Sequence, residues 1–130
     1  RQKGLEKLLI WTSVESNKDL QAIYQGAQIF IYPSIYEGFG IPVVEALLSN
    51  TPVVTSNTSS LPEAAGPYSK CINPDSPEEI ANAVSEILSN PELQEKMKVE
   101  GRKYAETTFN TEFVTQQMMD IYKNVLTIKS

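Results

Sequence analysis

Apolar residues fall along the chain in short continuous runs, and helical or turn-forming sequence follows each run. Continuous apolarity, without alternation between apolar and polar positions, is typical of strands covered on both faces, as in parallel sheets. The predicted strands cover residues 8–12, 28–32, 52–56 and the less apolar 69–72. We therefore expect a buried parallel sheet.

Helical segments lie between and after these runs, because apolar residues recur there three and four positions apart. Three of the segments carry proline at or near their first position, where its missing N–H costs least. The predicted helices cover residues 18–26, 41–50, 77–89, 91–107 and 111–128. Alternating strands and helices predict a doubly wound α/β domain, with a Rossmann-like parallel sheet and a helical C-terminus.

Composition and charge exclude several classes of function. The chain has 130 residues and a net charge of −5, which disfavours a nucleic acid polymer as partner because phosphates would be repelled. It has no histidine and one cysteine, Cys71, which excludes His-dependent triads, His-ligated zinc sites and an internal disulfide. This cysteine usage fits a reducing cytoplasm. No apolar run approaches the ~20 residues of a membrane-spanning helix.

The segment most suggestive of chemistry is residues 33–45, where a glycine-containing loop leads from a predicted strand into a helix. In open α/β sheets, ligands bind beyond the carboxyl ends of the strands, and a helix N-terminus there favours a diphosphate. Gly38 and Gly40 permit unusual φ angles, and Glu37 and Glu45 can accept hydrogen bonds from sugar hydroxyls. From the residues alone, a ligand-binding loop and a tight structural turn are equally open.

Residues 37–45, Glu-Gly-Phe-Gly-Ile-Pro-Val-Val-Glu, resemble the Glu-x7-Glu motif of family 4 glycosyltransferases, which are retaining enzymes of the GT-B fold. The similarity extends to residues 27–34 before the motif and to residues 51–56, 60–63 and 77–79 after it, so that it covers about residues 4–126. So many matches in the same order make the resemblance specific.

The resemblance implies a role for each matching residue. Glu37 would be the catalytic residue at the donor sugar, and Glu45 would bind the ribose hydroxyls of the nucleotide. The backbone of four residues would hold the sugar and the diphosphate: Gly38, Phe39, Gly40 and Ile41. Val14 would lie near the base. No metal or other cofactor is expected, and the nucleotide-diphosphate sugar is the substrate.

Two parts of such enzymes have no counterpart here: the Arg and Lys that clamp the diphosphate, and the N-terminal acceptor domain. Residues 1–130 therefore resemble the later part of a C-terminal donor-binding domain, and we expect little or no transferase activity from them alone. In the strand order 3-2-1-4-5-6, the four predicted strands correspond to strands 3, 4, 5 and 6. The sheet would be incomplete, and rearrangement, exchange between chains or self-association would have to cover its apolar edge.

Three classes of function remain open at this point. The first is transfer of a sugar to a glycan or lipid-linked acceptor, in the cytoplasm or at the periphery of the membrane. The second is a non-catalytic nucleotide-binding module, and the third is an interaction domain that has lost its ligand. Residues 57–60 are interpreted as a capped turn, and the basic residues between 96 and 103 as a solvated helix face.

Overall fold

The computed structural model describes residues 8–10, 16–35, 39–109, 112 and 116. Within this part of the chain, β1 (Phe30–Tyr32), β2 (Val53–Ser56) and β3 (Lys70–Ile72) form a parallel sheet in the order β1-β2-β3. Phe30 lies opposite Val53, and Val54 lies opposite Lys70. The parallel sheet is confirmed, and its three strands fall within three of the four predicted runs.

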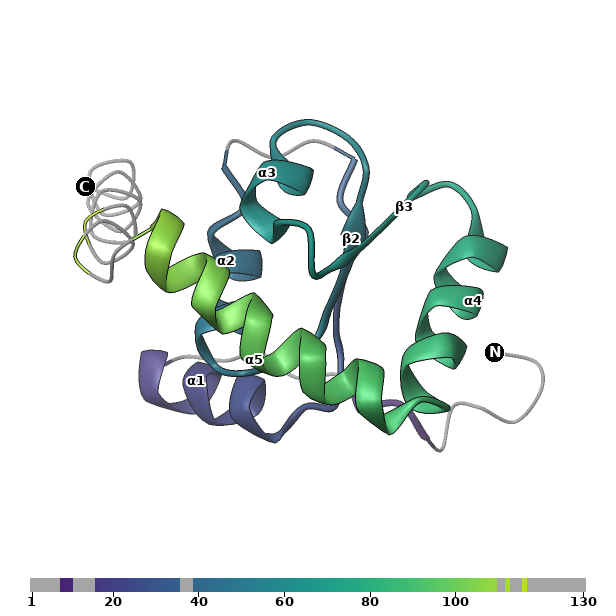
Figure 1. Cartoon of the computed structure of the whole chain (residues 1–130). Helices are drawn as coiled ribbons and strands as arrows, with labels where there is room; N and C mark the ends of the chain where they lie inside the picture. The colour runs from purple at the N-terminus through teal and green to yellow at the C-terminus, as the bar shows by residue number, and fades with distance from the viewer. Residues whose placement is uncertain (1–7, 11–15, 36–38, 110–111, 113–115, 117–130) are drawn as a thin grey trace.

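Five helices with both ends among the described residues accompany these strands: α1 (Asn17–Gly26), α2 (Ile41–Leu48), α3 (Leu61–Ala65), α4 (Pro77–Leu88) and α5 (Pro91–Thr108). Figure 1 shows α4 on one side of the sheet and α1, α2 and α3 on the other, with α5 crossing between the two sides. Side chains cap three of the helices, because Ser16, Ser76 and Asn90 accept hydrogen bonds from backbone N–H groups of the first turn. In the part of the chain that the structure describes, no helix is both long and apolar enough to cross a membrane.

The core lies on both faces of the sheet, and β2 separates its two halves. Val53 belongs to the half formed with α2 and α3, whereas Val54 belongs to the half formed with α4. All four residues of β2 are buried, as expected for the central strand of a covered parallel sheet. Helix α2 is also enclosed, since five of its eight residues are buried.

The strand predicted over residues 8–12 is wrong where the structure describes it. Residues 8–10 form no strand, and their side chains are 76%, 51% and 88% exposed. A strand needs a neighbour for its backbone hydrogen bonds, and residues 8–10 pair with no strand of the described sheet. Residues 11 and 12 lie outside the described residues.

Two further differences concern the helices. Helix α3 was not predicted, although Pro62 stands in its first turn. Of the helix predicted over 111–128, Glu112 and Gln116 are helical and the remainder lies outside the described residues.

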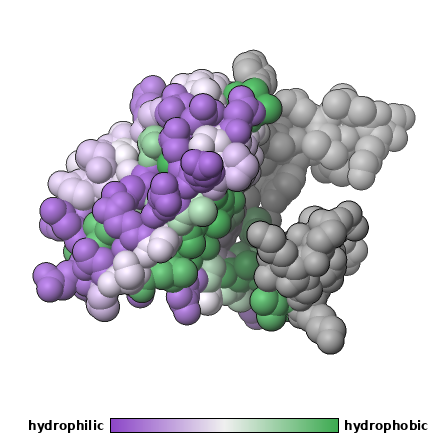
Figure 2. Space-filling view, turned by 90° about the vertical axis from the view of Figure 1, so that its right-hand side faces the viewer, coloured by the Kyte–Doolittle hydropathy of each residue, from purple (hydrophilic) through white to green (hydrophobic). Residues whose placement is uncertain are grey.

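Apolar side chains are exposed at two places, on the edge strand β1 and on the outer surface of α4. Ile31 of β1 is 41% exposed, and no other described strand pairs with the outer edge of β1. On α4, Ala81, Val84 and Leu88 line a shallow hollow in the surface. Figure 2 looks onto that side of the molecule and shows hydrophobic side chains in a strip between hydrophilic ones. At the outer edge of β1, Ile31 thus stays partly exposed among the described residues, and pairing of this edge remains a prediction.

Candidate functional site

The loop that follows β1 enters α2 through Gly40, whose backbone is left-handed with φ 88° and ψ 39°. This conformation costs other L-residues roughly 1–2 kcal/mol. A Cβ on Gly40 would also lie 2.9 Å from Cδ2 of Leu61 and 3.2 Å from Cβ of Ala64. Glycine is thus required here by its φ angle and by the close approach of α3.

Helix α2 begins with two backbone N–H groups that have no acceptor among the described residues. The N–H groups of Val43 and Val44 both donate to the carbonyl of Gly40, at 3.0 and 3.3 Å. No described acceptor lies within hydrogen-bonding reach of the N–H groups of Gly40 and Ile41, and Pro42 has no N–H. Together with the helix dipole, two such donors favour an anion at this end of α2.

The side chains of Phe39 and Ile41 pack inward. The Phe39 ring meets Phe109 edge to face, with centroids 5.2 Å apart, and Ile41 is only 7% exposed. Both side chains thus pack in the core, and a contact of their backbone with a ligand remains a prediction. Glu37, Gly38 and Val14, the other three predicted residues of the loop and base region, lie outside the described residues.

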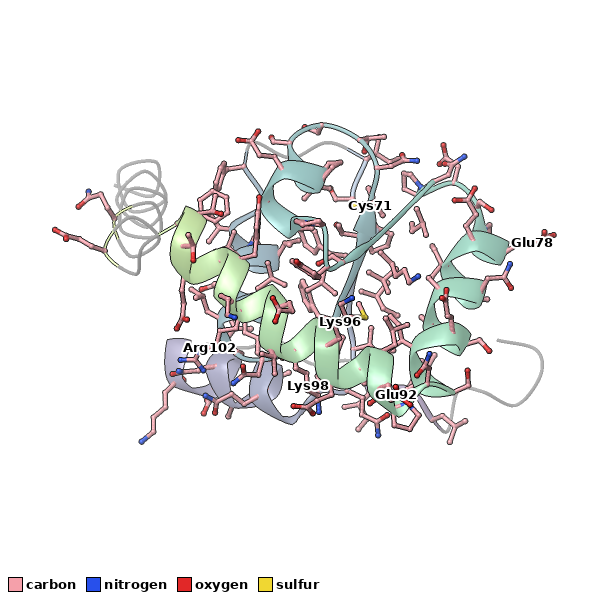
Figure 3. The ribbon with its side chains drawn as sticks, viewed as in Figure 1. Cys71, Glu78, Glu92, Lys96, Lys98 and Arg102 are labelled. Atoms are coloured by element: carbon pink, nitrogen blue, oxygen red, sulfur yellow. The ribbon has the colours of Figure 1, made fainter. Side chains whose placement is uncertain are left out.

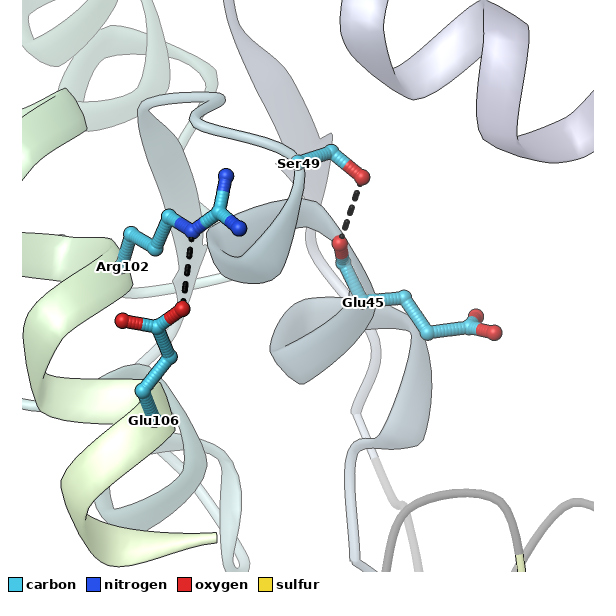
Figure 4. Close-up of polar contacts among 4 residues, drawn as sticks. All are labelled: Glu45, Ser49, Arg102 and Glu106. Carbon is cyan, nitrogen blue, oxygen red and sulfur yellow. Dashed lines mark hydrogen bonds and ion pairs between the residues drawn. The ribbon is translucent and has the colours of Figure 1, made fainter. Parts of the chain in front are cut away.

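Glu45 lies in the second turn of α2 and is half-buried. The hydroxyl of Tyr24 in α1 donates a hydrogen bond to its Oε1 at 3.2 Å. Burial raises the pKa of the Glu45 carboxyl above its ordinary value, and the hydrogen bond from Tyr24 lowers that pKa in part. In Figure 4 the carboxylate points away from α5, where Arg102 pairs with Glu106 at 3.0 Å. The structure therefore contains a half-buried carboxylate that no described cation neutralises.

A second loop borders the same edge of the sheet. It covers residues 57–60, between β2 and α3, and its Thr58 hydroxyl donates to the carbonyl of Ile35 at 3.3 Å. Ser59 adopts φ 58°, which is uncommon outside glycine. The carboxyl ends of β1 and β2 are held together as well, because the Thr55 hydroxyl donates to the Tyr32 carbonyl at 2.7 Å. The predicted capped turn is present as a turn, but Ser60 makes no side-chain cap on α3.

The basic residues of α5 lie away from this edge. Figure 3 shows Lys96, Lys98 and Arg102 along α5. The predicted solvated face is confirmed for the basic residues between 96 and 103 except Lys98, which is half-buried. Lys96 borders a hollow of about 220 Å³ at the amino end of β3. The other lysine of that hollow, Lys70, is already paired with Glu86 at 3.0 Å. Among the described residues, no cluster of His, Cys, Asp or Glu side chains could hold a metal ion.

Two mannosyltransferases are among the curated relatives of this chain. The MMP alpha-(1->4)-mannosyltransferase of Mycolicibacterium hassiacum is 30% identical over 95% of this chain and 31% of that protein. The O-antigen chain mannosyltransferase B of Escherichia coli is 36% identical over 93% of this chain and 35% of that protein. The chain thus spans about a third of the length of these relatives.

Solved structures share the fold. A sucrose-phosphate synthase from Thermosynechococcus elongatus superposes with a TM-score of 0.80 at 26% identity, over 98% of this chain and 32% of that chain. The C-terminal domain of a glycosyl transferase group 1 family protein from Francisella tularensis superposes with a TM-score of 0.73 at 26% identity, over 83% of this chain and 56% of that chain. The α/β fold with its parallel sheet is that of GT-B glycosyltransferases. The family described as "Glycosyl transferases group 1" matches residues 1–104, and the chain belongs to this family.

Proposed function

We propose that the protein containing this chain transfers a mannosyl group from a nucleoside diphosphate to a glycan or lipid-linked acceptor, with retention of configuration at the anomeric carbon. Membership of the glycosyl transferases of group 1 supports the reaction type. The choice of mannose draws on two relatives that are named as mannosyltransferases. The chain would form part of the donor site, and an acceptor domain elsewhere in the polypeptide would complete the enzyme.

The observation that carries this proposal is the combination of two features of α2. The N–H groups at its start that no described acceptor uses suit a diphosphate, and the carboxylate of Glu45, one turn further on, suits the hydroxyls of a ribose. Glu37 would stabilise charge near the anomeric carbon of the sugar. The nucleoside diphosphate would leave the anomeric carbon and the acceptor oxygen attack it on the same face, with stabilisation of the leaving diphosphate as the largest catalytic effect. We propose no metal in this mechanism and a cytoplasmic location.

Binding of nucleoside diphosphates to the full-length protein tests the role of Glu45. UDP, GDP and ADP are titrated by calorimetry, and the tightest of the three is then compared with its 2′-deoxy form. A hydrogen bond to a charged acceptor contributes about 1.5–3 kcal/mol, so Glu45→Gln should raise Kd roughly 10- to 100-fold. Removal of the ribose hydroxyl should weaken binding to the wild type but have little further effect on Glu45→Gln.

Glu95→Gln is the matched control, because it makes the same change of charge on an exposed position of α5. We expect it to bind like the wild type. If Glu45→Gln binds nucleoside diphosphates as tightly as this control, the ribose-binding role is refuted. Binding without any transfer to mannosyl acceptors would favour the second class, a non-catalytic nucleotide-binding module.

A further inference from the structure

Tyr24 connects α1 to the candidate donor site, although it lies 21 positions before Glu45 and outside every motif of the sequence. It belongs to the buried face of α1 and is 5% exposed. Its hydroxyl reaches Oε1 of Glu45, whereas no described side chain donates to Oε2. One oxygen of the carboxylate is therefore occupied within the protein, and the other is left for a ligand.

The position of Tyr24 is fixed by contacts of both its ring and its backbone. The ring meets Phe30 of β1 edge to face, with centroids 5.2 Å apart at 78°. The Tyr24 carbonyl accepts a hydrogen bond of 2.6 Å from the Thr51 hydroxyl and one of 3.2 Å from the Ala27 N–H. Because both the ring and the backbone of Tyr24 are held, its hydroxyl can orient Glu45 without rearranging when a ligand binds.

The hydrogen bond from Tyr24 is important for the ionisation of Glu45 because of the groups that surround this carboxyl. Among the described residues, the titratable group that faces it is the Tyr24 hydroxyl from α1, and Tyr32 from β1 lies near Tyr24 in turn. Helix α5 contributes the Arg102–Glu106 pair, which lies on the other side of α2 from the carboxylate (Figure 4). Burial disfavours the ionised carboxylate, and Tyr24 is the described group that opposes this effect.

We propose that Tyr24 is a positioning residue of the nucleotide site, which holds Glu45 ionised and turned so that Oε2 accepts the ribose hydroxyls. Tyr24 acts through Glu45 and touches no ligand itself. This inference rests on the proposed function of Glu45 and adds to it a specific partner from another helix.

Tyr24→Phe in the full-length protein tests the proposal, since it removes the hydroxyl and keeps the ring. With the tightest binder among UDP, GDP and ADP as probe, we expect Kd to rise roughly tenfold, the lower end of what loss of a hydrogen bond to a charged group costs. The pKa of Glu45 should rise further in this variant. The ratio of variant to wild-type Kd should therefore grow as the pH falls, and this ratio cancels the titration of the probe's own phosphates.

Tyr104→Phe is the matched control, because the Tyr104 hydroxyl also makes a structural hydrogen bond, of 2.5 Å, to the Glu63 carbonyl. It should lower the melting temperature about as much as Tyr24→Phe while leaving Kd and its pH profile unchanged. In a Glu45→Gln background, Tyr24→Phe should have no further effect on Kd.

Different failures have different meanings. If Glu45→Gln weakens binding but Tyr24→Phe changes neither Kd nor its pH dependence, the positioning role is overturned and the role of Glu45 stands. An equal loss in Tyr24→Phe and Tyr104→Phe, with a constant ratio across pH, would show a structural role and overturn the proposal too. If Glu45→Gln itself binds normally, the proposed function of Glu45 fails first.

Discussion

Substitution of Gly40 by alanine should destabilise the junction of α2 and α3 far more than an ordinary loop substitution. The left-handed backbone at φ 88° costs an alanine about 1–2 kcal/mol. The new methyl group would lie 3.2 Å from Cβ of Ala64, which cannot rotate away, and 2.9 Å from Cδ2 of fully buried Leu61. Overpacking of this kind typically costs about 1–3 kcal/mol. We expect a total of about 3 kcal/mol.

Native-state hydrogen exchange, measured on peptides from α2 and α3, reports this loss locally in a polypeptide of any length. A loss of about 3 kcal/mol corresponds to a roughly hundredfold fall in protection. Gly26→Ala is the control, because a Cβ there meets no atom within 4 Å and Gly26 ends α1 without a positive φ. It should leave protection in α2 unchanged.

The two contributions can be separated. Leu61→Val shortens one side chain that the new methyl group would strike, so Gly40→Ala should cost less in that background than in the wild type. An unchanged cost would assign the effect to the backbone alone. If Gly40→Ala lowers protection in α2 no more than Gly26→Ala does, the requirement for glycine at this position is refuted.

Two further predictions concern the half-buried carboxyl of Glu45 and the backbone of Gly66. Burial raises the pKa of Glu45 in the folded state, so the folded protein binds a proton at this carboxyl more readily than the unfolded chain does. The free energy of unfolding therefore falls as the pH rises from the ordinary pKa of the group towards the raised one. Glu45→Gln should therefore increase the free energy of unfolding at neutral pH in urea titrations, and a gain that persists unchanged at pH 4 would contradict this. Gly66 has φ 75° and ψ 180°, and a Cβ there would lie 2.4–2.8 Å from the Tyr104 ring, so Gly66→Ala should cost about 3 kcal/mol or more. Its melting temperature should fall, and Tyr104→Leu should remove part of that loss; equal losses in both backgrounds would contradict the ring contact.

The sequence predicted most of the sheet and the helix that carries Glu45, because each of these elements leaves a local signal. Runs such as 52–56 are apolar throughout, and β2 is buried throughout. Proline at the start of α2, α4 and α5 marked where those helices begin. The spacing of the motif placed Glu45 in α2 and its glycine at the entrance of that helix.

The remainder depended on contacts between distant segments. Residues 8–10 are as apolar as a strand, yet a strand forms only beside a partner, and these residues pair with none of the described strands. The bond between Tyr24 and Glu45 could not be predicted either, because Tyr24 occupies an ordinary position on the apolar face of α1. Helix α3 is only five residues long and carries too little periodicity to stand out.

The enclosure of α2 limits where this part of the chain can accept substitutions. Its five buried residues fill the space between the sheet, α3 and α5, so that few substitutions along this helix would be tolerated. In the turn at residues 57–60, Asn57 is exposed, whereas the exposed Ser59 is held at φ 58°. The side chain of Asn57 can therefore change at little cost in stability, and a laboratory library of variants at this edge of the sheet would best begin there.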